Sequence, residues 1–171
     1  MSNILVTGGA GYIGSHVVEK LIKLKKRVFI IDNLSTGYRK LINKKAKFFL
    51  SDIKNFKKIK KIILKNNIES IIHLAALLDV NESQRKPNKY FKNNVVGTKN
   101  ILNACKNTSV RNFIFSSTAA VYKDGIYKVN EKSEKKPKSN YGKDKLKTEK
   151  LIQNKLKKYK INYAILRYFN V

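Results

Sequence analysis

Short apolar runs alternate with helical segments along the whole chain, and this alternation restricts the possible folds more than any other feature. Six runs rich in Ile, Val and Phe have the length and composition of strands: Ile4–Thr7, Arg27–Asp32, Ala46–Leu50, Glu69–Leu74, Asn112–Ser116 and Asn162–Arg167. Helical periodicity lies between them, in Gly14–Lys25, Phe56–Lys65, Asn88–Lys106 and Gly142–Tyr159. Because parallel strands need crossovers of this kind, we predict an α/β fold with a doubly wound parallel sheet.

The net charge of +27 on 171 residues raises the question of a nucleic-acid partner. However, 33 of the 38 cations are Lys and only 5 are Arg, and the chain also holds 19 Asn and 19 Ile. Lys, Asn and Ile have AT-rich codons, whereas nucleic-acid readers favour the bidentate Arg side chain. We therefore interpret the basicity as genome composition on a solvated surface. Weak, salt-sensitive binding to polyanions is expected, but no specific nucleic-acid partner.

The apolar runs are short, and Leu74–Leu78 is among the longest. A membrane span needs roughly 18 apolar residues, so none is expected. Met1, Ser2 and Asn3 lack the basic region of a signal peptide. The lone Cys105 lies in an apolar helical stretch, which fits a buried thiol in a reducing compartment. We expect a cytoplasmic protein without membrane association.

A glycine-rich segment, Thr7–Gly14, connects the first predicted strand to the first predicted helix. Gly8, Gly11 and Gly14 permit a tight turn and close approach to a pyrophosphate, which would bind the free amides of the helix N-terminus. Asp32 ends the second strand 21 residues after Gly11, where a carboxylate accepts hydrogen bonds from ribose hydroxyls and repels a 2′-phosphate. The alternative is a glycine turn with only a structural role. The pattern favours a Rossmann-type site that prefers NAD to NADP.

Three polar residues have both a binding and a structural interpretation. Asp52, followed by the apolar Ile53, could face an adenine or could cap the helix that begins at Phe56. His73 and His16 have no second ligand at metal-ligand spacing, so we interpret both as hydrogen-bonded core histidines. No metal site is expected.

Tyr141 and Lys145 are four residues apart at the start of the last predicted helix, which puts phenol and ammonium on one helix face. A Tyr with a pKa of about 10 is a poor base at neutral pH, and lowering its pKa by roughly three units requires about 4 kcal/mol of phenolate stabilisation. Lys145 and a positively charged nicotinamide are candidates to supply it. Thr118, at the end of the fifth strand, would orient the reacting oxygen. The polar segment Thr118–Asn140 is predicted to be a surface loop beside the ligand crevice.

With these residues placed, the sequence resembles the extended short-chain dehydrogenase/reductases, and among them the sugar-nucleotide epimerases. Beyond the glycine segment, the resemblance lies in Asp32–Leu34, His73–Ala76, Asn93–Thr98, Ser116–Tyr122, Tyr141–Lys145 and Leu166–Asn170. Related dehydratases typically carry an Asp-Glu pair where this chain has Ala119 and Ala120, so an acid and base for dehydration are lacking. Leu78, Thr118 and Lys123 depart from the usual Lys, Ser and Gly of the epimerases.

The resemblance implies a set of site residues around a bound NAD. The pyrophosphate would lie against Gly8, Gly11, Tyr12, Ile13 and Gly14. The adenosine would contact Asp32, Asn33, Leu34, Asp52 and Ile53, and the rest of the cofactor Leu74, Ala75, Ala76, Leu77, Asn93, Tyr141, Lys145 and Phe169. Thr118, Tyr141 and Lys145 would be the catalytic residues, with Thr118, Tyr141 and Asn170 touching the sugar nucleotide.

The activity implied by the resemblance is epimerisation of a UDP-sugar at C4 through a 4-keto intermediate, which interconverts UDP-glucose and UDP-galactose. Tyr141 would take the proton of the 4-hydroxyl while NAD takes and returns the hydride. Family members are about twice as long, which implies that residues 1–171 are the NAD-binding Rossmann domain, truncated before the sugar-nucleotide domain. An NAD-binding module without turnover, or an epimerase for another sugar nucleotide, are the alternatives. A homodimer formed through Asn88–Lys106 and Gly142–Tyr159 is also implied.

Overall fold

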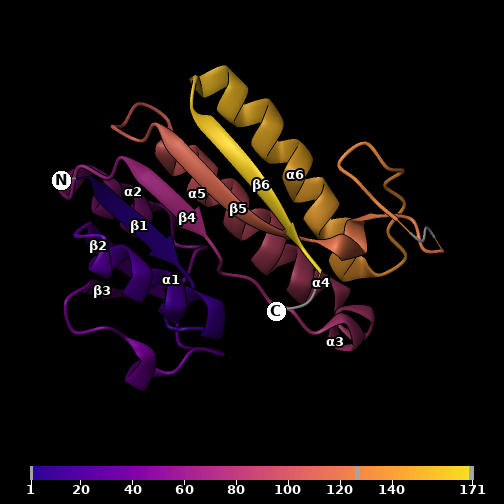
Figure 1. Cartoon of the computed structure of the whole chain (residues 1–171), viewed down its shortest axis with the longest axis horizontal. Helices are drawn as coiled ribbons and strands as arrows, with labels where there is room; N and C mark the ends of the chain where they lie inside the picture. Colours follow the sequence, from indigo (N-terminus) through magenta and orange to yellow (C-terminus); the bar gives the residue numbers. More distant parts are fainter. Residues whose placement is uncertain (1, 126–127, 170–171) are drawn as a thin grey trace.

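One parallel sheet of six strands runs through the protein, as seen in a computed structural model that describes residues 2–125 and 128–169. The strands are β1 (Asn3–Thr7), β2 (Arg27–Asp32), β3 (Lys47–Leu50), β4 (Ser70–His73), β5 (Asn112–Thr118) and β6 (Asn162–Tyr168). Their order is β3-β2-β1-β4-β5-β6 (Figure 1), and every neighbouring pair is parallel. The order reverses between β1 and β4, and ligands of open α/β sheets bind at such a switch point. The predicted doubly wound sheet is confirmed.

The long helices α1 (Tyr12–Lys23), α2 (Phe56–Lys65) and α6 (Asn140–Tyr159) match three of the predicted ones. The helix predicted over residues 88–106 is instead divided into α4 (Pro87–Tyr90), a π-helix η2 (Phe91–Val96) and α5 (Gly97–Cys105). The sequence does not predict α3 (Val80–Arg85), because so short a segment shows no apolar period. Its N-terminus is capped by Asp79, whose Oδ1 accepts a hydrogen bond from the Glu82 amide at 2.8 Å.

The two faces of the sheet are covered to different extents (Figure 1). Helices α2, α5 and α6 pack on one face, in a core that includes Leu5, Ile71 and Phe113. On the other face, α1 packs over the strands β1, β2 and β3. Figure 1 shows β5 and β6 in front of α5 and α6, with no helix of the described residues over them. As a result Leu166, on the edge strand β6, keeps 42% of its surface exposed.

Cys105 lies at the end of α5 inside the larger core, as predicted. Its Sγ donates a hydrogen bond to the Ile101 carbonyl oxygen at 3.2 Å. Burial raises the pKa of this thiol to about 12, which keeps it protonated and unreactive.

The loop predicted between β5 and α6 begins with packed residues. A single 3-10 turn, η3 (Ala119–Val121), follows β5 directly, and Val121 and Tyr122 are buried rather than exposed. The turn is capped by Thr118, whose Oγ1 accepts a hydrogen bond from the Ala120 amide at 3.2 Å. From Lys123 onward most of the described loop residues are exposed, as expected.

Candidate functional site

The glycine segment forms a tight turn between β1 and α1. The Gly8 amide donates to the Ile31 carbonyl oxygen at 2.8 Å, and the Gly11 amide donates to the Gly8 carbonyl oxygen at 3.1 Å. Gly8 has a φ of +74°, and a Cβ there would lie 2.7 Å from the Ala75 amide nitrogen. A Cβ on Gly14 would lie 2.0 Å from the Gly8 oxygen. The turn therefore requires glycine at Gly8 and Gly14, and it leaves the first turn of α1 without a side-chain cap.

The Asp32 carboxylate, at the end of β2, holds this turn in place. Its Oδ2 accepts a hydrogen bond from the Ala10 amide at 3.0 Å, and its Oδ1 accepts one from the Leu34 amide at 2.8 Å. Leu34 has a φ of +58°, an unfavourable conformation for a branched side chain. Since each carboxylate oxygen has two acceptor positions, Asp32 keeps capacity for further donors.

A cavity of about 310 Å³ lies above the carboxyl ends of β1, β2 and β4. Thirteen of the residues predicted from the sequence line it: Gly8, Gly11, Tyr12, Ile13, Gly14, Asp32, Asn33, Ile53, Leu74, Ala75, Ala76, Leu77 and Asn93. Seven further residues line it that were not predicted as binding residues: Ile31, Ser35, Thr36, Gly37, Ser51, Leu78 and Ser116. Each of these lies in the carboxyl-terminal part of a strand or in the segment that follows a strand, which is the signal that could have identified them.

Two residues selected for the adenosine region stand beside this cavity without lining it. Leu34 takes part through the hydrogen bond of its amide to Asp32. Asp52 accepts a hydrogen bond from the Asn33 side chain at 3.2 Å and pairs with Lys54 at 3.3 Å. Asp52 is not the cap of α2, because Asn55 accepts the capping hydrogen bond from the Lys58 amide.

The π-helix η2 brings two successive Asn side chains to the cavity wall. Asn93 lines the cavity and donates to the Asn94 Oδ1 at 3.0 Å. Asn94 is buried, accepts a hydrogen bond from the Leu77 amide at 2.9 Å and donates to the Leu77 carbonyl oxygen at 3.0 Å. A π-helix often marks a functional site, and here it fixes the wall that follows β4.

Tyr141 and Lys145 lie together near the N-terminus of α6, and both are buried. The helix is capped by Ser139, which accepts a hydrogen bond from the Gly142 amide at 3.0 Å. The Lys145 Nζ lies 5.8 Å from the centre of the Tyr141 ring and donates to the Ser116 carbonyl oxygen at 2.7 Å. Tyr141, Lys145 and Thr118 do not line the cavity, but Ser116 does, so this hydrogen bond links the Tyr141–Lys145 pair to the cavity wall.

The pKa of Tyr141 is raised rather than lowered, because burial disfavours the phenolate more than its hydrogen bond with Thr118 favours it. The lowered pKa that we expected for Tyr141 is therefore not found in this structure. Burial also lowers the pKa of Lys145 to about 8, although the nearby Glu149 carboxylate opposes the change. Lys145 is thus a cation at neutral pH that ionises closer to neutrality than an ordinary lysine.

The two histidines have different environments. His73 is a core residue, as predicted, with its ring nitrogens hydrogen-bonded to the hydroxyls of Thr7 at 2.6 Å and Thr98 at 2.8 Å. Burial lowers its pKa to about 3. For His16 the prediction is wrong: its side chain is exposed on α1 and packs edge-on to Tyr12 at 5.1 Å, because its position on the helix faces solvent.

Phe169 and Asn170 follow β6. The Phe169 side chain is 65% exposed and does not line the cavity. Asn170, which was selected as a sugar-nucleotide contact, lies outside the described residues.

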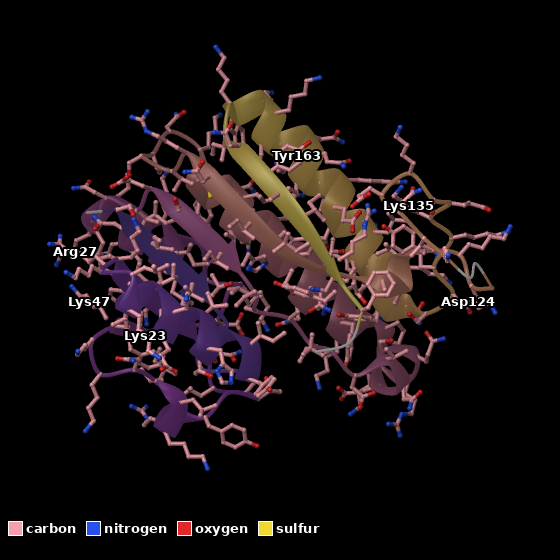
Figure 2. All side chains as sticks on the ribbon, viewed as in Figure 1. Lys23, Arg27, Lys47, Asp124, Lys135 and Tyr163 are labelled. Atoms are coloured by element: carbon pink, nitrogen blue, oxygen red, sulfur yellow. The ribbon has the colours of Figure 1, made fainter. Side chains whose placement is uncertain are left out.

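Basic side chains point outward on several sides of the molecule (Figure 2). Lys23, Arg27 and Lys47 project on one side and Lys135 on the other. The described residues contain no group of three His, Cys, Asp or Glu side chains placed to hold a metal ion. Across residues 2–125 and 128–169, no helix is both long and apolar enough to cross a lipid bilayer.

The strand order, the glycine turn and the cavity at the switch point define a Rossmann-type α/β protein. The chain belongs to the NAD dependent epimerase/dehydratase family, whose sequence model matches residues 4–171. A similar curated protein is the UDP-glucose 4-epimerase of Lactobacillus helveticus, which is 42% identical over 171 residues covering 98% of this chain and 51% of that protein.

Solved structures agree with this assignment. The UDP-Glc/GlcNAc 4-epimerase from Campylobacter jejuni is 38% identical and superposes with a TM-score of 0.95 over 99% of this chain and 54% of its own. The UDP-glucose 4-epimerase from Brucella ovis, solved in complex with NAD, is 36% identical with a TM-score of 0.94 over 99% and 52%. The chain spans about half the length of the curated relatives it matches.

Proposed function

We propose that this chain is the NAD-binding half of a UDP-sugar 4-epimerase, with residues 1–171 as its dinucleotide-binding domain. The main observation in support is the hydrogen bond from Lys145 to the Ser116 carbonyl oxygen. Through it the Tyr141–Lys145 pair contacts the wall of the cavity that the glycine turn also lines. The NAD complex of the Brucella ovis relative supports the choice of cofactor.

The residues of the cavity fit a dinucleotide. The pyrophosphate would bind at the N-terminus of α1, where the glycines let the backbone approach and no side chain caps the helix. Asp32 would accept the ribose hydroxyls with its remaining lone pairs, and its charge disfavours a 2′-phosphate. When bound, NAD supplies reversible oxidation at the sugar C4, which passes through a 4-keto sugar.

The role proposed for Tyr141 is to take the proton from the sugar 4-hydroxyl and later return it. Thr118 would orient the same oxygen, since its hydroxyl lies near enough to Tyr141 to favour the phenolate and lower the pKa of Tyr141 against the effect of burial. Lys145 would stabilise the phenolate as a neighbouring cation, which is needed because burial alone raises the pKa of Tyr141.

UDP-glucose and UDP-galactose are the proposed substrates, and Asn170 is the proposed first contact to the sugar nucleotide. Ala119 and Ala120 offer no acid or base for dehydration. The name of the Campylobacter jejuni relative includes GlcNAc, so an N-acetylated sugar nucleotide is the next substrate to assay.

A second candidate function is NAD binding without turnover by the chain alone. It is favoured by the exposed side of β6, where Leu166 keeps 42% of its surface accessible. We further propose a cytoplasmic homodimer that pairs through the helical stretch Pro87–Cys105 and α6. Size measurement in solution tests the dimer.

The test compares wild type with Tyr141→Phe and, as a matched control, with Tyr163→Phe on the exposed edge strand (Figure 2). NAD binding is measured by calorimetry and the conversion of UDP-galactose by a coupled assay. We expect Tyr141→Phe to bind NAD and to lose conversion, while Tyr163→Phe matches wild type. NAD binding without conversion by wild type would support the second candidate, and absence of NAD binding would refute both.

A further inference from the structure

Glu149 is a buried carboxylate one helical turn after Lys145 on α6, with 2% of its surface exposed. Its Oε1 accepts hydrogen bonds from the Ser117 hydroxyl at 2.5 Å and from the Arg167 Nε at 2.9 Å. Its Oε2 accepts a third from the Arg167 Nη2 at 2.7 Å. Such a bidentate pair fixes the geometry of both side chains more strongly than a single hydrogen bond.

Arg167 extends this connection from β6 to the start of the loop after β5. Its Nη1 donates to the Tyr122 hydroxyl at 2.9 Å, and its guanidinium lies 5.0 Å from the centre of the Tyr122 ring. The Glu149–Arg167 ion pair therefore connects α6 and β6 with the end of β5 and with Tyr122 in the loop that follows β5.

Lys145 is held by the same strand end. Its Nζ donates to the Ser116 carbonyl oxygen, while the adjacent Ser117 donates its hydroxyl to Glu149. Two consecutive residues of β5 thus hold two consecutive turns of α6. The helix cannot shift along the strand without breaking both contacts.

We propose that Glu149, which accepts hydrogen bonds from Arg167 and Ser117, is a positioning residue. It holds Lys145 and Tyr141 at their places beside the end of β5. The inference rests on the proposed function, because it concerns the same Tyr141–Lys145 pair. Glu149, Arg167 and Lys145 do not line the cavity themselves. The effect of Glu149 would reach the cavity wall through Lys145, which donates a hydrogen bond to the Ser116 carbonyl oxygen.

A buried Arg–Glu pair often has only a structural role. An effect of Glu149 on Lys145 would distinguish a positioning role from a purely structural one. The Glu149 carboxylate raises the pKa of Lys145 against the effect of burial. Among the described residues, Tyr141 on α6 and His73 on β4 also lie near Lys145, while Arg167 on β6 contacts Glu149.

The experiment follows Lys145 by NMR titration, with its signal assigned through Lys145→Arg, and measures NADH affinity by fluorescence. Glu149→Gln keeps the shape of the side chain and removes its charge. We expect its Lys145 midpoint to fall by about one pH unit or more and NADH binding to weaken about tenfold. Ile63→Val shortens a buried side chain of α2 in the core on which α6 also packs, and it is the stability control. It should change neither the Lys145 midpoint nor the NADH affinity.

Glu149→Asp keeps the charge but withdraws the carboxylate from Ser117 and Arg167. It is the variant to measure if Glu149→Gln does not fold. It should keep the Lys145 midpoint near that of wild type and still weaken NADH binding. Variants of Glu149 that lose only thermal stability, with the midpoint and the NADH affinity of wild type, would overturn the proposal. A wild-type chain that binds no NADH would refute the proposed function, while the Lys145 titration would still test the positioning.

Discussion

Asp32 accepts a hydrogen bond from the backbone amide of Ala10, so a side chain at the end of β2 fixes the middle of the glycine turn. The two residues are 22 positions apart in the sequence, and their hydrogen bond ties the turn between β1 and α1 to the end of β2. With the second hydrogen bond, from Leu34, one carboxylate orders both backbone segments at this end of the cavity.

The change Asp32→Asn tests this double contact. An amide accepts at only one of its two positions, so one backbone amide loses its partner, at a cost of roughly 1–3 kcal/mol in the free energy of unfolding. NAD should bind about tenfold more weakly. The preference for NAD over NADP should decrease, since the negative charge that repels the 2′-phosphate of NADP is removed. Urea unfolding and titrations with both nucleotides measure these effects. Asp124→Asn, an exposed partner of Lys138, should leave all three unchanged.

Gly14→Ala tests the close approach in the glycine turn. The added Cβ would sit 2.0 Å from the Gly8 oxygen, so the turn must open. We expect NAD binding to be lost and the melting temperature to fall. Gly125→Ala is the matched control: its φ of +81° makes the substitution strained, but no atom lies within 4 Å of the new Cβ. Normal NAD binding by Gly14→Ala would contradict the role of this turn.

Asn94→Ala tests the wall that follows β4. The substitution leaves the half-buried Leu77 amide and carbonyl without their Asn94 partner, which costs about 1 kcal/mol of stability. NAD binding should weaken as well, because Leu77 lines the cavity. Asn100→Ala removes a similar side-chain contact, to the Lys54 carbonyl oxygen, at an exposed position on α5. That control should retain full NAD affinity in the same calorimetric titration.

The pH dependence of stability should reflect His73, whose pKa is lowered from 6.5 to about 3, first by burial and then by Lys145. Above pH 6.5 the ring is neutral in both folded and unfolded chains, and its contribution is fully present. As the pH falls from 6.5 toward 3, only the unfolded chain binds the proton, so stability decreases by at most about 1.4 kcal/mol per pH unit.

Urea unfolding between these pH values measures that slope. His73→Gln should have a shallower slope than wild type, whereas His16→Gln, on the exposed side of α1, should keep it. An unchanged slope in His73→Gln would show that other groups account for the acid sensitivity.

The strands, their parallel arrangement and the glycine turn could be predicted because each rests on local pattern. Apolar runs such as Arg27–Asp32 mark buried strands, and glycines between strand and helix mark the turn. The π-helix could not be predicted, since Phe91–Val96 continues the helical period on both sides and the added residue per turn depends on tertiary contacts such as Asn94 with Leu77.

Site residues that act through side-chain ionisation were harder to foresee. The spacing of Tyr141 and Lys145 predicts a shared helix face, but the pKa of Tyr141 depends on how deeply the fold buries it, which spacing does not encode. Likewise the sequence offers no sign that Glu149 and Arg167 pair, because they meet only when β6 is placed beside β5.

Cys105 is the single cysteine of the sequence, and the core seals its sulfur from reagents. The folded surface therefore has no competing thiol, and a cysteine introduced at Tyr163 would be the one site open to a maleimide dye. Site-specific fluorophores can thus be attached to β6 without first removing Cys105, which makes nucleotide binding and the proposed subunit pairing accessible to single-molecule measurement.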